Sequence, residues 1–154
     1  SAVTLGNFGG DAVIGGTPTS GVYNLDGTEF GRVYADQRIA FALLDEPGWH
    51  KDAAKAEALR GPLMAAAASY FLRARDAKGR VTDPVARFHL GNGAQLDRLN
   101  YLGDISANGL KQSHGLMVNY LYDLNRIEMN HEAFAERGTV TAAPDVQRAL
   151  PNTK

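Results

Sequence analysis

The residues best suited to chemistry in this chain lie in two short stretches. In the first, His89 comes at the end of a run with helical character, just before an Asn92-Gly93 turn. An imidazole has an ordinary pKa of about 6.5, so it can give or take a proton near neutral pH. A histidine at a helix end can equally bond a nearby carbonyl, and the pattern leaves both roles open. We expect His89 to lie at the mouth of a pocket as the leading catalytic candidate.

The second stretch, residues 116–122, has the period of two that favours a β-strand, although residues 121–128 could begin a helix. One face would carry Leu116, Val118, Tyr120 and Tyr122, and the other Met117, Asn119 and Leu121. A buried tyrosine hydroxyl near a reacting carboxylate would serve as a hydrogen-bond donor, and half-buried strand aromatics are the alternative. The pattern leaves open whether Tyr120 or Tyr122 would be that donor. Tyr120, Asn119 and Asn92 are substrate-binding candidates, although Asn92 also suits the turn itself.

The composition limits the chemistry and the partners. The chain has 154 residues, 44% of them hydrophobic and 21% charged, which is typical of one soluble globular domain. The absence of cysteine excludes disulfides, thiolate zinc sites and cysteine nucleophiles. The four histidines have no metal-like spacing, so we expect no metal ion. The net charge of -1 gives no reason to expect nucleic acid as a partner.

Neither a membrane anchor nor a leader is apparent in the sequence. It contains no run of 18 apolar residues. The N-terminal residues lack the charged and apolar regions of a signal peptide. We therefore predict a cytoplasmic protein that does not associate with membranes.

Residues 1–42 differ in character from the rest of the chain. Eight of the 17 glycines lie in the first 31 positions, and Asp26-Gly27 is a hairpin signal. The glycines lack the spacing of a phosphate-binding loop. This segment is expected to form loops and short strands, the strands at residues 2–5, 12–14, 22–25 and 29–34.

Helical signals begin near residue 39. Residues 51–60 are rich in Ala, Lys, Glu and Leu and predict a helix. Gly61 is expected to end that helix, so that Pro62 begins a second one. The apolar stripe of this second helix is typical of a helix face that packs against a core. The stripe comprises Leu63, Ala66, Ala67, Tyr70, Phe71 and Ala74.

The remaining elements set the expected fold class. The order of these elements resembles the closing pattern of acyl-coenzyme A acetyltransferases, in which a helix and a tight turn are followed by a strand, a loop and a strand. We predict an α/β (α+β) protein, the C-terminal portion of a GNAT-like mixed sheet flanked by helices. The expected elements are a helix at 84–89, a turn at 91–93, a strand at 94–102, a polar connection at 104–113, a strand at 116–122, and a tail at 132–150 with a short helix, an extended piece at 139–141 and a final turn.

Several segments, in order, resemble the C-terminal part of malonyl-coenzyme A decarboxylase over roughly residues 44–150. On this basis residues 43–154 form one unit, and residues 1–42 are unmatched. The matching segments are Pro47-Gly48-Trp49-His50, Asp83-Pro84-Val85-Ala86, Phe88-His89-Leu90, Asn92-Gly93-Ala94, Leu99-Asn100-Tyr101, Gly115-Leu116-Met117-Val118-Asn119-Tyr120 and Asn130-His131-Glu132.

The resemblance implies a lyase of fatty acid metabolism that converts malonyl-coenzyme A to acetyl-coenzyme A and carbon dioxide, without metal or organic cofactor. His89 matches the family's catalytic histidine, and Tyr122 matches a tyrosine that lines its active site. The resemblance therefore implies that Tyr122 is the second catalytic residue. Family members associate, so a homo-oligomer is a further expectation.

This sequence departs from the family pattern at its N-terminal side. The family's upstream helical domain, pyrophosphate-binding turn and Ser-Pro segment have no match in residues 1–42, and we do not nominate Ser20. We therefore predict that the chain alone decarboxylates poorly or not at all. The alternatives are a non-catalytic acyl-coenzyme A binding or assembly module and an acyl-coenzyme A N-acyltransferase.

Overall fold

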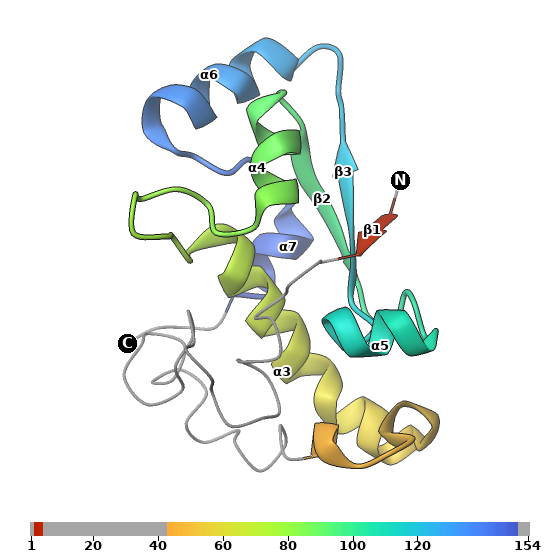
Figure 1. Cartoon of the computed structure of the whole chain (residues 1–154). Coiled ribbons are helices and arrows are strands. Elements are labelled where there is room, and N and C mark those ends of the chain that lie inside the picture. Colours follow the sequence, from red (N-terminus) through yellow and green to blue (C-terminus); the bar gives the residue numbers. More distant parts are fainter. Residues whose placement is uncertain (1, 5–42, 151–154) are drawn as a thin grey trace.

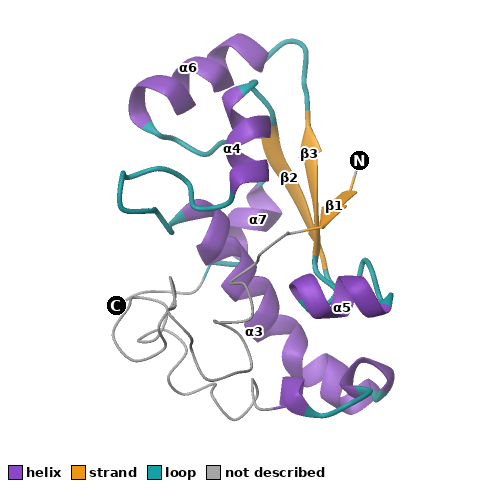
Figure 2. Ribbon diagram, in the orientation of Figure 1, coloured by secondary structure: helices purple, strands orange, loops and turns teal. Residues whose placement is uncertain are grey.

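In the computed structural model of the chain, the described residues are 2–4 and 43–150. The strands and the hairpin expected between residues 12 and 34 lie outside them. Helices pack around a small sheet (Figures 1 and 2). The strands are β1 (Ala2–Thr4), β2 (Gln95–Asn100) and β3 (Met117–Leu121), and the helices are η3 (Leu43–Asp45), η4 (Trp49–Lys51), α3 (Ala53–Leu72), α4 (Pro84–Gly91), α5 (Ala107–Ser113), α6 (Ile127–Arg137) and α7 (Pro144–Arg148).

The sheet has the order β1-β3-β2, and both pairings are antiparallel. The three expected strands at 2–5, 94–102 and 116–122 are therefore confirmed. A register shift follows Leu96, where β2 departs from regular pairing with β3. Leu96 also forms a parallel bridge with Ala142, in the tail. This mixture of helices with a small antiparallel sheet confirms the α/β class, while its likeness to acetyltransferases stays a prediction.

The long helix α3 corrects the expectation of two helices. It runs from Ala53 to Leu72 without a break and contains Pro62. Asp52 caps it by accepting hydrogen bonds from the next residues' backbone N–H groups. A proline inside a helix costs about 3 kcal/mol. The helix persists because Leu59 and Leu63, which flank the proline, are both fully buried in the core.

The expected polar connection at 104–113 contains the helix α5 (Ala107–Ser113), which the residue pattern does not predict. Ser106 caps it, and its side chain accepts a hydrogen bond from Gly109 N at 3.1 Å. Leu110 supplies one partly buried apolar contact with the core. With a single apolar anchor and an internal glycine, the segment lacks the apolar spacing that predicts a helix.

The tail closes the structure against β2. The helix expected from residue 132 begins earlier, as α6 at Ile127. The expected extended piece is present, since Leu96 N donates to Thr141 O at 2.8 Å and Ala143 N donates to Leu96 O at 2.9 Å. The helices α3, α4 and α7 all contact β2. They pack over the sheet face that carries the core residues of β2 and β3 (Figure 1).

The largest fully buried side chains are Phe71, Leu59, Leu63, Leu90, Leu96, Leu116, Val81 and Val118. None of the helices in the described part of the chain is both long enough and apolar enough to cross a bilayer.

Replacing Phe71 by alanine should lower the free energy of unfolding by about 3–5 kcal/mol, because the fully buried ring would leave a cavity. Urea denaturation followed by circular dichroism measures this loss. Leu124→Ala is the control, since Leu124 is 86% exposed and its truncation should change stability by less than about 0.5 kcal/mol. Similar losses for the two variants would contradict the described core.

Replacing Gly93 by alanine should destabilise the protein more than Gly79→Ala. Both glycines have positive φ angles, of 92° and 77°, so both variants carry the same kind of backbone strain. A Cβ at Gly93 would also lie 2.5 Å from Ile127 O, whereas nothing lies within 4 Å at Gly79. Thermal unfolding of the two variants compares them. Equal losses of stability in the two variants would show that Ile127 of α6 does not crowd the turn at Gly93.

Candidate functional site

His89 lies in the last turn of α4, and the surrounding sequence explains why the helix forms there. Asp83 caps its first turn, since Oδ1 accepts a hydrogen bond from Ala86 N at 2.9 Å. At the other end Asn92 N bonds His89 O at 3.1 Å, and Gly93 turns the chain with a φ of 92°. The imidazole therefore sits where a short helix meets a sharp turn, and it is half-buried.

The His89 ring is hydrogen-bonded to Tyr122, which follows the end of β3. The Nδ1 and hydroxyl oxygen atoms are 2.7 Å apart, and the two ring centroids lie 5.9 Å from each other. Either group can be the donor, depending on the imidazole tautomer. With Nδ1 occupied, Nε2 is the nitrogen left for another group. Within residues 2–4 and 43–150 it makes no hydrogen bond.

Tyr120 forms the other wall of the site. Its ring stacks on the His89 imidazole with the centroids 4.3 Å apart and the planes inclined by 22°. Phe88 presents its ring to the same imidazole edge-on, at 5.2 Å. Tyr120 is 6% exposed, and burial raises the pKa of its phenol far above the usual value. The ring beneath His89 is therefore a neutral, apolar support over the working pH range.

Partial burial also changes the pKa of His89 itself. Burial lowers the pKa of the His89 imidazole below 6.5, because it disfavours the charged form. The neutral ring, with one N–H and one lone pair, is therefore the main species at pH 7. If the Tyr122 hydroxyl donates to Nδ1, the proton of the neutral ring lies on Nε2.

The expected substrate-binding asparagines lie outside this cluster. Asn92 is exposed in the turn after α4. Asn119 lies on the opposite sheet face from Tyr120, because successive strand residues alternate, and its Oδ1 accepts a hydrogen bond from Asn100 Nδ2 at 2.7 Å. The structure thus brings together His89, Tyr120 and Tyr122, and it leaves the two asparagines apart.

Two residues of α6, not identified from the sequence, hold the turn that follows His89. The buried Asn130 donates from Nδ2 to Gly93 O at 3.2 Å. His131 Nδ1 lies 2.6 Å from Gly91 O. Both residues occur in the resemblance, but no sequence pattern links them to a turn so far away along the chain.

No serine in the described ranges is hydrogen-bonded to His89. Ser113, which is fully buried, donates to carbonyl oxygens at the end of α5. The described residues also contain no group of three histidine, aspartate or glutamate side chains placed to hold a metal ion.

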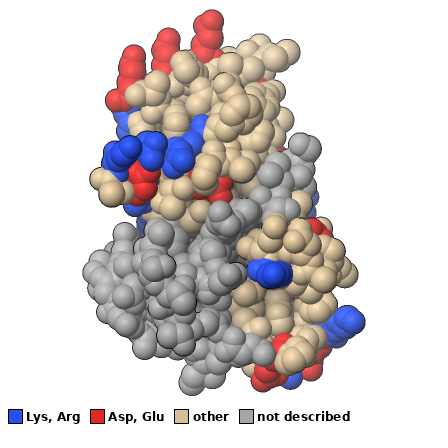
Figure 3. All heavy atoms as spheres, in the orientation of Figure 1, with Lys and Arg blue, Asp and Glu red and all other residues tan. Residues whose placement is uncertain are grey.

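The surface beside the site is acidic along α6. Glu128, Glu132 and Glu136 are exposed and recur every four residues, so they share one side of the helix. Figure 3 shows acidic side chains projecting from the end of the molecule where Figure 1 places α6. Such a row repels anions.

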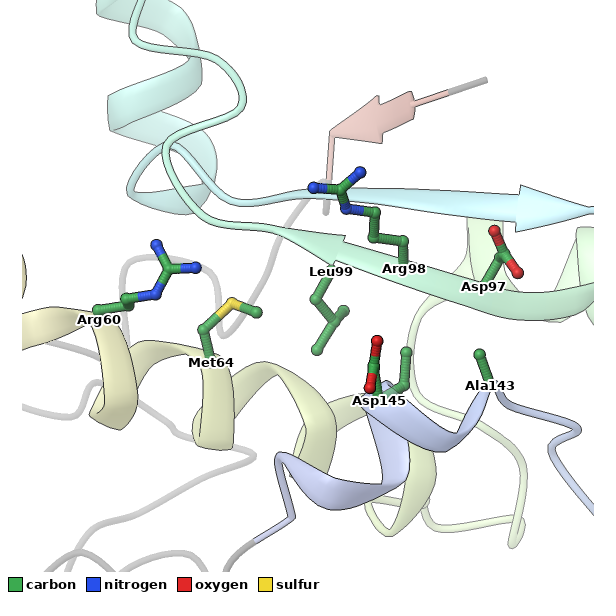
Figure 4. Close-up of a pocket in the computed structure, with 8 residues that line it drawn as sticks. Arg60, Met64, Asp97, Arg98, Leu99, Ala143 and Asp145 are labelled. Atoms are coloured by element: carbon green, nitrogen blue, oxygen red, sulfur yellow. The ribbon is translucent and has the colours of Figure 1, made fainter.

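A cavity of about 500 Å³ lies elsewhere, between α3, the β2 edge and α7 (Figure 4). None of the five site residues expected from the sequence lines it. In Figure 4, Arg60 and Met64 point toward the cavity from α3, and Asp145 does so from α7. Its lining residues are Arg60, Met64, Asp97, Arg98, Leu99, Ala143, Asp145 and Val146.

Known structures and sequences resemble this chain. A crystal structure of malonyl-CoA decarboxylase from Rhodopseudomonas palustris is 57% identical, with a TM-score of 0.73, over 75% of this chain and 27% of its own. One from Agrobacterium vitis is 52% identical, with a TM-score of 0.73, over 76% of this chain and 29% of its own. The rat (Rattus norvegicus) protein named "Malonyl-CoA decarboxylase, mitochondrial" is 34% identical over 142 residues, which cover 82% of this chain and 29% of that protein.

The chain thus spans less than a third of the length of these relatives. The sequence model of one family, described as "Malonyl-CoA decarboxylase C-terminal domain", matches residues 24–154. The match begins upstream of residue 44, where the resemblance was expected to start. It covers most of the chain, so this protein belongs to the malonyl-CoA decarboxylase C-terminal domain family.

Proposed function

We propose that this chain supplies the histidine and tyrosine part of a malonyl-CoA decarboxylase active site. The observation that carries the proposal is the 2.7 Å contact between His89 Nδ1 and the Tyr122 hydroxyl. It fixes one ring nitrogen while the ring lies flat on Tyr120, which leaves Nε2 for the substrate. The names of the relatives support malonyl-CoA as that substrate.

The reaction needs stabilisation of negative charge. The bond between the carboxylate and the α-carbon breaks, and its electron pair passes to the α-carbon and the thioester carbonyl as carbon dioxide leaves. The α-carbon then takes up one proton, which gives the acetyl thioester. Because charge develops on the thioester oxygen, a hydrogen-bond donor aimed at that oxygen lowers the barrier.

His89 is suited to be that donor in its neutral form. With the Tyr122 hydroxyl donating to Nδ1, the ring proton lies on Nε2 and can bond the thioester oxygen. Stacking on Tyr120 keeps the ring from turning away. Preorganised donors of this kind act more strongly where water is excluded, and Phe88 adds an apolar rim, since its side chain is 64% exposed beside the imidazole.

The support for the other expected roles differs between residues. Tyr120 is retained as a substrate-site residue because it touches the imidazole. Asn92 is a weaker candidate, exposed one turn beyond His89. Asn119 could bind substrate only if the substrate lay on the sheet face opposite Tyr120. A homo-oligomer, the cytoplasmic location and the weak activity of the chain alone remain predictions.

A chimera tests the catalytic role of His89. Residues 43–150 would replace the corresponding segment of the Rhodopseudomonas palustris decarboxylase, and carbon dioxide release from malonyl-CoA would be measured. The chimera should be active. His89→Ala should lower kcat at least about 100-fold, the usual minimum for a positioned acid or hydrogen-bond donor. His50→Ala, in η4, is the matched control and should be near wild type.

The same chimera separates the alternatives. Retained activity in His89→Ala would refute the proposal. A chimera that binds malonyl-CoA without turnover would favour a non-catalytic binding module. Acetyl transfer to an amine without carbon dioxide release would favour an N-acyltransferase.

The pH profile tests which form of the imidazole acts. Burial lowers the His89 pKa, so the neutral ring persists below pH 6.5. Protonation at Nδ1 leaves the proton on Nε2 but reverses the Tyr122 hydrogen bond, so the hydroxyl no longer donates to the ring and the arrangement proposed for the active site is lost. The kcat/KM of the chimera should therefore be constant above about pH 6.5 and fall only at lower pH. A loss of activity as the pH rises through neutrality would instead show that the imidazolium is the active form.

A further inference from the structure

The helix that carries His89 is too short to orient itself. From Pro84 to Gly91 it has 8 residues, or about 12 Å at 1.5 Å per residue. Two turns of helix are not stable alone, so contacts at the two ends decide where the helix lies. The C-terminal end is held by Asn130 and His131 of α6. The N-terminal end is held by Asp83.

Asp83 is a buried carboxylate with two different partners. It is 2% exposed, and burial raises its pKa. Oδ1 accepts the hydrogen bond from Ala86 N at 2.9 Å, which caps α4, while Oδ2 accepts one from the Tyr70 hydroxyl at 3.3 Å. A buried carboxylate is costly unless it is hydrogen-bonded, and the helix N-terminus and Tyr70 offset that cost.

Tyr70 is a fixed point because it belongs to α3. It is 3% exposed within the core, and its ring packs edge-on against Phe71 with the centroids 5.2 Å apart. The bond to Asp83 therefore ties the start of α4 to the longest helix in the described part of the chain.

The same carboxylate also lies close to the support of His89. The charge of Asp83 contributes, after burial, to the raised pKa of Tyr120, the ring on which His89 stacks. Asp83 precedes the first turn of α4 and His89 lies in its last turn, so this helix joins the capping carboxylate to the stacked imidazole. Without the anchor at Asp83, the helix could rotate about its own axis, and such a rotation would carry the imidazole off that ring and away from Tyr122.

We propose that Asp83 and Tyr70 are positioning residues, whose buried hydrogen bond fixes α4 against α3 and so holds the His89 imidazole on Tyr120 and in reach of the Tyr122 hydroxyl. The catalytic consequence rests on the function proposed above, whereas the placement of the ring does not. Both side chains are buried, so we assign them a positioning role and no contact with substrate. Both act through the position of His89.

Tyr70→Phe tests the link, because it removes one hydroxyl and keeps both the ring in the core and the Asp83 cap. Nitrogen-detected NMR of the 154-residue chain would follow the His89 ring through a pH titration. The His89 pKa should move up toward about 6.5, the value of an exposed histidine, and the Nδ1 shift should lose the signature of the Tyr122 bond. In the chimera, kcat should fall about tenfold with KM unchanged, as expected when a reacting group is displaced by a fraction of an ångström.

Tyr101→Phe is the matched control. It also removes a partly buried tyrosine hydroxyl, one that donates to Ala56 O of α3, but it leaves α4 untouched. Both Tyr→Phe variants should lose similar stability, and only Tyr70→Phe should change the His89 titration. Equal effects of the two variants on His89 would reduce the role of Tyr70 to general stability and overturn the proposal.

Substitution of Asp83 separates the link from the cap. Asp83→Ser retains a good capping residue, but its side chain is too short to serve Ala86 N and Tyr70 together. It should change the His89 titration as Tyr70→Phe does. A wild-type titration in Asp83→Ser or in Tyr70→Phe would overturn the proposal. The NMR measurement needs no turnover. An inactive chimera would therefore count against the proposed function only, and the His89 titration would still test the positioning role.

Discussion

The contact of His89 with Tyr120 in β3 and with Tyr122 just after it is the constraint on which the site depends. It joins a helix end to a strand end that is 33 residues further along the chain. The contact requires the turn at Gly93 to bring β2 back beside α4, and β3 to pair with β2 in the observed register. A shift of that register by one residue would move Tyr120 to the other sheet face and leave the imidazole without its support.

Burial gives this contact its chemical character. The stacked Tyr120 keeps a neutral phenol, and the partly buried imidazole is held in its uncharged form. In a neutral ring with Nδ1 bonded to Tyr122, the other nitrogen is a donor when the tyrosine hydroxyl donates to Nδ1 and an acceptor when it accepts. The core beneath it, built on α3, is therefore part of the site, since Tyr70 reaches from that helix to the cap of α4.

The family membership and the geometry give two separate descriptions of this chain. The relatives are malonyl-CoA decarboxylases more than three times as long as the segment that matches this chain. Residues 2–4 and 43–150 provide a histidine with two tyrosines, and one side of α6 carries a row of exposed glutamates.

The sequence by itself determined the family, the strands at 94–102 and 116–122, the turn at Asn92-Gly93, and the nomination of His89 and Tyr122. These follow from local signals, because turn residues, strand alternation and ordered motifs are readable within a few positions. Only the tertiary structure decided that α3 continues through Pro62, that Asn119 is hydrogen-bonded to Asn100, and that α6 and Asp83 hold the helix that carries His89. Those outcomes depend on burial and on contacts between distant segments, which no local pattern of residues encodes.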